Sequence, residues 1–197
     1  MAQALKKLEP KSLLKLDLGC GPHPKEGFDG VDQYGFGGKV KHVLDLRKTP
    51  WPWKTSSVEE INCSHFLEHL IASERCSFLN ECYRILIPNG KMTLITPHWA
   101  SNRAYGDPTH QWPPVSEMFF YYLSKKWRDE NAPHTDASIW KQGFSCDFEA
   151  GWGYSFATSL ASRNQEYRQF ALENYKEAAL DTMATLTAKK EEGKKPL

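Results

Sequence analysis

The stretch that decides the fold of this chain spans residues 13–32 and reads LLKLDLGCGPHPKEGFDGVD. Its first six residues are mostly apolar, which is typical of a strand buried on both faces of a parallel sheet. Gly19 and Gly21 follow directly, and glycine lets the backbone turn tightly and lets a ligand approach it closely. The stretch ends at Asp32, and an acid at the tip of the second strand of a doubly wound sheet can hold the two hydroxyls of a ribose. The pattern therefore predicts an α/β fold with a ligand-binding turn after its first strand.

Further apolar segments extend this pattern along the chain. Short apolar runs predict strands over residues 40–46, 58–64 and 91–96, and apolar residues at helical spacing predict a helix over residues 73–86. Two more strands are expected within residues 143–160, separated by a pair of glycines. Together with the two strands of the first stretch, these segments predict a seven-stranded sheet.

The C-terminal region is predicted to form a long helix over residues 164–192. No glycine or proline occurs between Tyr154 and Glu192, so nothing in this stretch breaks a helix. One apolar stripe at helical spacing supports the prediction, and its members are Leu172, Tyr175, Ala179, Met183 and Leu186. Such a helix would cover the core or form an oligomer contact.

Composition narrows the class of protein. The chain has 197 residues, enough for one domain with a sizeable core, and its formal net charge of +1 calls for no polyanionic partner. No apolar run approaches the ~20 residues that a membrane helix needs, and no signal peptide is visible after Met1. Its five cysteines form no C-x-x-C pair, which favours reduced thiols. We therefore expect a cytoplasmic protein that binds neither nucleic acid nor a membrane.

Several short motifs follow one another in an order that a known family shares. They are Leu16-Asp17-Leu18-Gly19-Cys20-Gly21, Gly30-Val31-Asp32, Asp45-Leu46, Ser64-His65-Phe66-Leu67-Glu68-His69-Leu70, and LNECYRILIPNGK over residues 79–91. With them, the chain resembles the class I S-adenosylmethionine-dependent methyltransferases of the small single-domain type. A dinucleotide dehydrogenase fits less well, because its pattern wants a third glycine where Pro24 stands.

The resemblance implies a fold, a cofactor and a reaction. The fold is a Rossmann-like, doubly wound sheet of seven mostly parallel strands with flanking helices, in a single domain over residues 1–197. The cofactor is S-adenosyl-L-methionine, and the reaction is methyl transfer to an acceptor that we expect to be a small molecule. Within this domain we expect a cofactor-binding core over 12–97, an acceptor-site or lid insertion over 98–142, terminal strands over 143–160 and the C-terminal helix.

The resemblance also implies a set of cofactor-binding residues. Gly19 and Gly21 would lie against the methionyl part, Asp32 would bind the ribose hydroxyls, and Asp45 would accept from the adenine amino group. The full set is Asp17, Gly19, Cys20, Gly21, Asp32, Asp45, Leu46 and His65. The family usually places a helix after the glycine motif, whereas only eight residues, two of them proline, separate Gly21 from Gly30 here. Fewer helix amides are therefore expected near the cofactor carboxylate.

Candidates for the acceptor site follow the strand predicted over residues 91–96. His98 and His110 are expected to be bases, because an imidazole has an unperturbed pKa near ~6.5, and Asp107 is expected to orient one of them. The segment 98–112 is expected to close over the methyl group with aromatic walls, which would come from Trp99, Tyr105 and Trp112. The alternative is that Asp107-Pro108-Thr109-His110 is a structural turn.

Two other functions stay open. The motif H-x-x-E-H, formed by His65, Glu68 and His69, could bind zinc on a helix and so indicate a zinc hydrolase. Because the motif follows a predicted strand at a strand-to-helix junction, we expect no metal ion there. A cofactor-binding protein without catalytic activity is the third possibility. The oligomeric state is not fixed by the sequence, and a homodimer is compatible with it.

Overall fold

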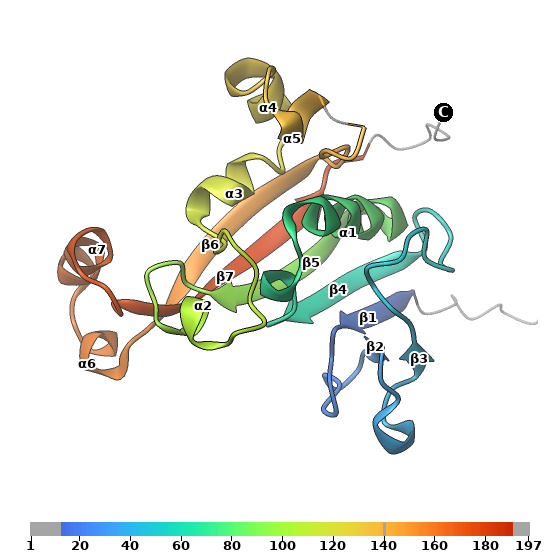
Figure 1. Cartoon of the computed structure of the whole chain (residues 1–197), viewed down its shortest axis with the longest axis horizontal. Coiled ribbons are helices and arrows are strands. Elements are labelled where there is room, and N and C mark those ends of the chain that lie inside the picture. Colours follow the sequence, from blue (N-terminus) through green and yellow to red (C-terminus); the bar gives the residue numbers. More distant parts are fainter. Residues whose placement is uncertain (1–12, 140, 191–197) are drawn as a thin grey trace, which may run out of the picture.

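The computed structural model describes residues 13–139 and 141–190. Its strands form one seven-stranded sheet in the order β3-β2-β1-β4-β5-β7-β6 (Figure 1). Their bounds are β1 Leu14–Leu18, β2 Asp29–Asp32, β3 His42–Val43, β4 Val58–Ser64, β5 Leu86–Pro97, β6 Phe148–Phe156 and β7 Ala179–Ala188. The pairs from β3 to β5 are parallel, whereas β7 runs antiparallel to both of its neighbours. The predicted mostly parallel, Rossmann-like sheet is confirmed.

The direction of strand addition reverses beside β1. From β1 the chain adds β2 and β3 on one side, and it then returns to add β4 and β5 on the other side. Leu18 pairs with Val31 of β2 and with Cys63 of β4, so the carboxyl ends of these three strands lie side by side. Ligands of open α/β sheets bind at such a reversal, outside the carboxyl ends of the strands.

The helix α1, Ala72–Ile85, connects β4 to β5 and packs on the sheet (Figure 1). Its buried apolar residues recur at helical spacing, and they are Phe78, Leu79, Cys82 and Ile85. Glu74 accepts a hydrogen bond from the Ile71 amide at 3.1 Å, which satisfies one amide at the start of the helix. Burying each large apolar side chain contributes about 1.5–3 kcal/mol, so this face fixes the helix on the sheet. The predicted helix over 73–86 is confirmed.

The other helices are short. They are η1 Phe36–Gly38, η2 Leu67–His69, α2 Arg103–Gly106, α3 Glu117–Tyr121, α4 Lys125–Asn131, α5 Asp136–Ile139, α6 Thr158–Ala161 and α7 Gln165–Asn174. Residues 19–28, between β1 and β2, contain turns and no helix, as the two prolines predict. In the part of the chain that the structure describes, no helix is both long and apolar enough to cross a membrane. All five cysteines are free thiols.

The C-terminal segment corrects the predicted helix over 164–192, of which residues 191 and 192 lie outside the described residues. The helix α7 ends at Asn174, and β7 follows as a strand paired with both β5 and β6. Along β7, Ala184 and Leu186 are buried, whereas Met183 and Thr185 are exposed. This period of two residues is that of a strand. The predicted apolar stripe joined Leu172 of α7 to apolar residues of β7, of which Met183 and Leu186 lie on opposite faces of the strand.

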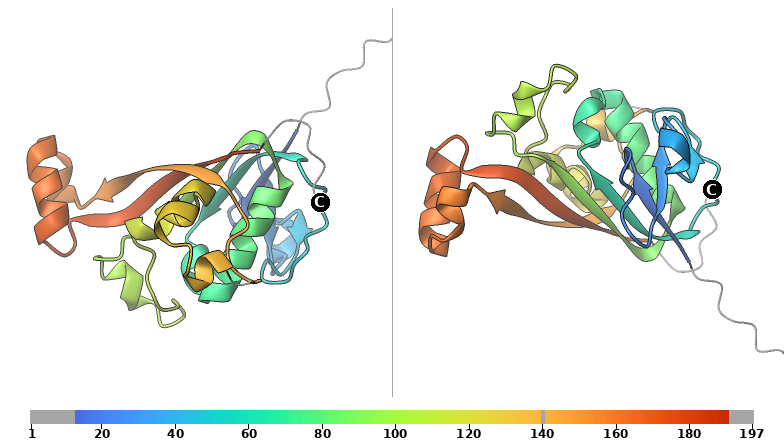
Figure 2. Two further views of the ribbon diagram at one scale, coloured as in Figure 1. Left: turned by 90° about the horizontal axis from the view of Figure 1, so that it is seen from above. Right: turned by 90° about the horizontal axis from the view of Figure 1, so that it is seen from below.

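The predicted pair of strands within residues 143–160 is also wrong. That region contributes one strand, β6, whose antiparallel partner is β7. Gly151 and Gly153, expected to separate two strands, lie inside β6 opposite Thr185 and Met183. The strands β6 and β7 extend beyond the rest of the sheet and carry α6 and α7 at their far end (Figure 2).

Candidate functional site

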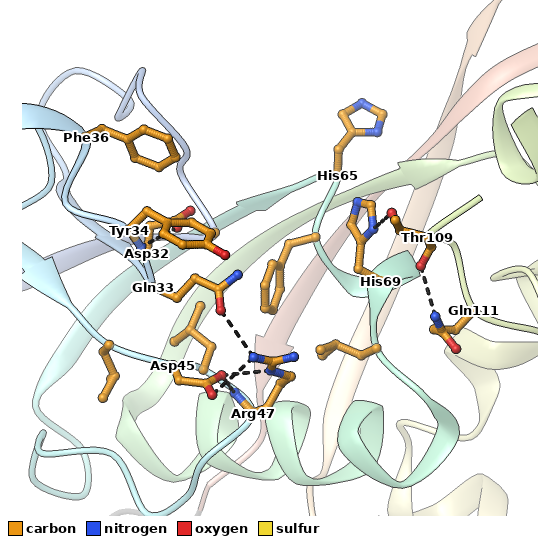
Figure 3. Close-up of a pocket in the computed structure, with 15 residues that line it drawn as sticks. Asp32, Gln33, Tyr34, Phe36, Asp45, Arg47, His65, His69, Thr109 and Gln111 are labelled. Atoms are coloured by element: carbon orange, nitrogen blue, oxygen red, sulfur yellow. Dashed lines mark hydrogen bonds and ion pairs between the residues drawn. The ribbon is translucent and has the colours of Figure 1, made fainter. Parts of the chain in front are cut away.

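A cavity of about 570 Å³ opens at the edge where β1, β2 and β4 end. It has two sides (Figure 3). One side carries Asp32, Gln33, Tyr34, Phe36, Asp45 and Arg47, and the other carries His65, His69, Thr109 and Gln111. The remaining lining residues are Gly19, Leu44, Leu46, Phe66 and Leu70. The cavity therefore lies where the reversal of strand order predicts a ligand.

Gly19 forms the turn at the end of β1. Its φ of +69° lies in the left-handed region, which favours glycine. The amides of Gly19 and Cys20 both donate to the carbonyl oxygen of Val31, at 2.9 and 3.2 Å, and so tie the turn to β2. A Cβ on residue 19 would lie 2.6 Å from the ring of Phe66. Conformation and close packing both require glycine at this position.

Asp32 lies at the end of β2 and lines the cavity. Its Oδ2 accepts a hydrogen bond from the Gly21 amide and its Oδ1 accepts one from the Tyr34 amide, each at 3.0 Å. A carboxylate oxygen can accept two hydrogen bonds, so each oxygen retains a free lone pair. The side chain is held in place and can accept from two neighbouring hydroxyls of a ligand.

Asp17, Cys20 and Gly21 are not among the lining residues. Asp17 is buried, and its two oxygens accept from the Lys25 amide at 2.8 Å and from Asn62 Nδ2 at 2.6 Å, so it holds the loop after β1. Burial, together with the charges of nearby carboxylates, raises the pKa of the Cys20 thiol to about 11. That thiol stays protonated at neutral pH, which fits a packing residue.

Asp45 and Leu46 both line the cavity. Arg47 donates to Asp45 through Nε at 2.8 Å and through Nη2 at 3.2 Å, and the same Nη2 donates to Gln33 at 3.2 Å. The Arg47 guanidinium holds the pKa of the Asp45 carboxyl below its ordinary value. The Asp45 carboxylate at the cavity is therefore already paired with Arg47.

His65 follows β4 with a φ of +54°, in the left-handed region. Its Nδ1 lies 3.2 Å from Glu68 Oε1, and its Nε2 lies 3.9 Å from Asp181 Oδ1. The hydrogen bond with Glu68 raises the pKa of the His65 imidazole. The structure thus brings His65 to the cavity, next to two carboxylates.

The H-x-x-E-H motif does not lie on an α-helix, the arrangement that the zinc-hydrolase alternative requires. Only Leu67–His69 is helical, as the 3-10 turn η2, and His65 lies outside it with its left-handed backbone. His65 and His69 therefore do not share the face of an α-helix. Among the described residues, the group of side chains close enough to share a metal ion is Glu68, His69 and His110.

Asp107 and Thr109 form a tight turn. Asp107 Oδ1 accepts from the Thr109 amide at 2.8 Å and from Thr109 Oγ1 at 2.7 Å, and these bonds lower the pKa of Asp107. Thr109 Oγ1 lies 3.0 Å from His69 Nδ1. Asp107 was expected to orient His98 or His110. Its hydrogen bonds instead orient Thr109, and through it His69.

The loop that follows this turn docks on η2 and α1. The buried guanidinium of Arg75 donates to the carbonyl oxygens of Leu70 at 2.8 Å, Gln111 at 3.0 Å and Pro113 at 2.6 Å. The Gln111 amide donates to the Glu68 carbonyl at 2.8 Å. Thr109 and Gln111 are thereby fixed on the wall of the cavity.

His98 does not reach the cavity. It is 2% exposed, its Nδ1 accepts from the Ala100 amide at 3.2 Å, and its Nε2 lies 3.1 Å from Glu117 Oε1. Both ring nitrogens are thus engaged inside the protein, and His98 is not among the lining residues. The expected place of His98 at the acceptor is corrected, because the end of β5 turns this side chain into the interior.

The expected aromatic walls also lie elsewhere. Trp99 and Tyr105 line a separate hollow beside the end of α7, and the Trp112 side chain is 78% exposed. Of the segment 98–112, Thr109 and Gln111 line the cavity, and His110 packs its ring edge-on against His69 with centroids 4.8 Å apart. The apolar surface of the cavity comes from Tyr34, Phe36, Leu44, Leu46, Phe66 and Leu70.

Sequence reasoning missed Arg47, Arg75, Thr109 and Gln111. Two of them carried a usable signal. Thr109 stands two residues after Asp107, the spacing of a turn in which the aspartate accepts from the backbone. Arg75 lies on the apolar face of the predicted helix, three residues before Phe78, where a charged residue indicates a buried hydrogen-bonding role.

Solved structures with the same fold come from different enzymes. An S-adenosylmethionine-dependent methyltransferase from Archaeoglobus fulgidus is 19% identical with a TM-score of 0.61, over 90% of this chain and 87% of that chain. The small RNA methyltransferase HEN1 is 13% identical with a TM-score of 0.51, over 94% and 24%. The [4+2]-cyclase SpnF is 13% identical with a TM-score of 0.50, over 91% and 75%. No protein-family model and no curated protein sequence matches the chain.

These likenesses establish the class of fold. The chain has the class I S-adenosylmethionine-dependent methyltransferase fold, with the cavity at the reversal of strand order. Because the similar structures include a cyclase and an enzyme that acts on small RNA, the fold alone selects neither a reaction nor an acceptor. Both have to be argued from the residues of the cavity.

Proposed function

We propose that this protein transfers the methyl group of S-adenosylmethionine to a small-molecule acceptor. The observation that carries the proposal is that Asp32 and the turn at Gly19 line the same cavity. An acid after the second strand and a glycine turn after the first are the two features that nucleoside-containing cofactors need in such a sheet.

The residues present fit the cofactor. Asp32 keeps one free lone pair on each oxygen, which suits two adjacent ribose hydroxyls. Leu44, Leu46 and Phe36 supply apolar surface for a flat base, and Asp45 lies beside them. When bound, S-adenosylmethionine supplies a methyl group already activated by its sulfonium, so the protein has mainly to position the acceptor and exclude water.

The acceptor is assigned to the opposite side of the cavity. His65, which was expected to contact the cofactor, lies on this side with His69, Thr109 and Gln111 (Figure 3). These residues supply polar groups there, as the few convergent polar groups of a ligand pocket do. The cavity volume of about 570 Å³ falls within the ~300–1,000 Å³ of small-molecule sites. The formal net charge of +1 does not call for a polyanionic partner such as a nucleic acid. These features favour a small molecule over a polymer.

The test is a turnover assay. The purified chain is incubated with S-adenosylmethionine and pools of small metabolites in a buffer that contains divalent metal ions, and release of S-adenosylhomocysteine is measured. We expect release that depends on one pool and that falls strongly in the Asp32→Asn variant. Tight binding of S-adenosylhomocysteine without release in any pool would instead favour the cofactor-binding protein without catalytic activity.

A further inference from the structure

Glu68, His69 and His110 form a cluster at the border of the cavity. One ligand atom of each lies within 4.8 Å of the others. An ion held at about 2.1 Å from each ligand spaces those ligands at most ~4.2 Å apart, so small side-chain rotations suffice to bind one ion. His69 and His110 are 41 residues apart in the sequence, and the packing of their two segments brings the cluster together.

Hydrogen bonds fix which nitrogen of each histidine is free. Thr109 has one hydroxyl hydrogen and donates it to Asp107, so Thr109 Oγ1 can only accept from His69 Nδ1. His110 Nδ1 lies 3.2 Å from the carbonyl oxygen of Ala104, which also can only accept. In the neutral form, both imidazoles therefore carry their hydrogen on Nδ1 and keep a lone pair on Nε2, which is the form that binds a metal ion.

Glu68 supplies a second, independent observation. Its side chain is 6% exposed, and Oε1 lies 3.2 Å from His65 Nδ1. Oε2 is buried and has no hydrogen-bond partner among residues 13–139 and 141–190. A buried carboxylate oxygen without a partner is costly, and a bound cation is one of the few groups that would satisfy it.

We propose that Glu68, His69 and His110 bind one divalent transition-metal ion at the acceptor side of the cavity. Two imidazoles and one carboxylate are a ligand set for ions such as Mn²⁺, Fe²⁺, Co²⁺ and Zn²⁺, and three protein ligands leave coordination positions open. This departs from the expectation of no metal ion, and it differs from the H-x-x-E-H site because His110 takes the place of His65.

The surroundings hold the ligands in place. Asp107 orients Thr109, which orients His69, as carboxylates orient metal-binding histidines elsewhere. Arg75 fixes the backbone at Gln111 and Pro113, just after His110. A site built on such supports needs little rearrangement when the ion binds.

A metal ion here has a consequence for the acceptor, which rests on the proposed function. His69 and Thr109 line the cavity, so the ion would border the space assigned to the acceptor. A bound divalent ion lowers the pKa of a coordinated hydroxyl or water. We therefore infer that the acceptor presents an oxygen atom, and that turnover requires the metal ion.

The test of the metal site is a titration of the tag-free, chelator-treated chain with Co²⁺, followed by visible absorption, and with Mn²⁺, followed by electron paramagnetic resonance. We expect one saturable site per chain and a rise of the unfolding temperature on adding the ion. Glu68→Gln and His110→Gln should abolish the Co²⁺ absorption and the Mn²⁺ resonance signal of the bound ion. Thr109→Val, which leaves all three ligands in place, should weaken binding about 10–100-fold.

The control is His134→Gln, because His134 is exposed and lies outside the cluster. It should bind Co²⁺ as the parent chain does. An unfolding experiment on each variant without metal shows whether that variant folds. If His110→Gln does not fold, the binding data of Thr109→Val and Glu68→Gln test the proposal. No saturable binding, or equal binding by Glu68→Gln and the parent chain, would overturn the proposal.

The metal proposal and the proposed function can be contradicted independently of each other. Affinity for S-adenosylhomocysteine is measured in the metal-free parent chain, where the methyltransferase assignment predicts binding. Co²⁺ binding without affinity for S-adenosylhomocysteine would contradict the methyltransferase assignment and support the metal site. Affinity for S-adenosylhomocysteine without Co²⁺ binding would contradict the metal site and support the methyltransferase assignment.

Discussion

The ring of Phe66 packs directly on the backbone of Gly19, and a Cβ on residue 19 would lie 2.6 Å from Phe66 Cγ. Phe66 follows β4 and Gly19 follows β1, so this contact joins the two strands between which the sheet reverses direction. Both residues line the cavity. The shape of the cavity between its two sides therefore depends on residue 19 having no side chain.

Gly19→Ala is expected to impair both folding and cofactor binding. The alanine would have to hold a φ of +69° and displace the Phe66 ring. The matched control is Gly27→Ala, because Gly27 has a φ of +79° and open space around its Cβ position. The control should lose only the ~1–2 kcal/mol of left-handed strain. Urea unfolding and calorimetry with S-adenosylhomocysteine compare the two, and equal losses would contradict the packing argument.

Arg75→Met is expected to loosen the loop that carries Thr109 and His110. The substitution keeps an apolar stem but leaves three carbonyl oxygens without their donor, at a cost on the order of 2 kcal/mol. Arg75→Lys should restore part of this loss, since an ammonium can reach fewer of the three carbonyls. Limited proteolysis reports the loop, and we expect faster cleavage within residues 107–113. Unchanged cleavage would show that other contacts hold the loop.

Glu117→Gln is expected to lower stability in a pH-dependent manner. Burial raises the pKa of Glu117, but hydrogen bonds from His98 and Tyr154 outweigh it, and the net pKa lies below the ordinary 4.5. A carboxyl with a lowered folded pKa stabilises the protein above its unfolded pKa, and this contribution is lost as the pH falls through the folded pKa. The difference in unfolding free energy between the parent chain and Glu117→Gln should thus be constant at pH 5–7 and shrink below about pH 4.5.

Urea unfolding at several pH values measures that difference, with Glu130→Gln as the control on an exposed glutamate. A difference in unfolding free energy between parent and Glu117→Gln that stays constant down to pH 3.5 would contradict the lowered pKa of Glu117. The same experiment bears on His98, whose engagement with Glu117 is the reason we give it a structural role in place of a catalytic one.

Local signals in the sequence predicted the strands and the helix near the cofactor side. The glycine turn, the acid at Asp32 and the apolar face of α1 each depend on residues close together in the chain, so their patterns could be read directly. β7 was missed because Ala179, Met183 and Leu186 are apolar and lie at helical spacing after a true helix, although Met183 and Leu186 face opposite sides of the strand. Its pairing with β5 and β6 decides its conformation, and such long-range pairing leaves no local signal.

The acceptor side was predicted less well for the same reason. His98 and His110 are equally plausible bases in the sequence, and only the turn after β5 buries one and places the other beside His69. The Asp107–Thr109 turn was foreseen as one of two alternatives, but its hydrogen bond to His69 crosses forty residues. The Glu68 oxygen that has no hydrogen-bond partner within the described part of the chain depends on packing from several segments and has no sequence signature.

The measurement that tests the central claim most directly is calorimetric titration of S-adenosylhomocysteine into the parent chain, Asp32→Asn and Asp29→Asn. Asp29 lies at the opposite end of β2, paired with Lys41 and away from the cavity, so its variant is the matched control. We predict one site per chain, a loss on the order of 1–3 kcal/mol in Asp32→Asn and unchanged affinity in Asp29→Asn. No binding to the parent chain, or equal affinity of the parent chain and Asp32→Asn, would contradict the account.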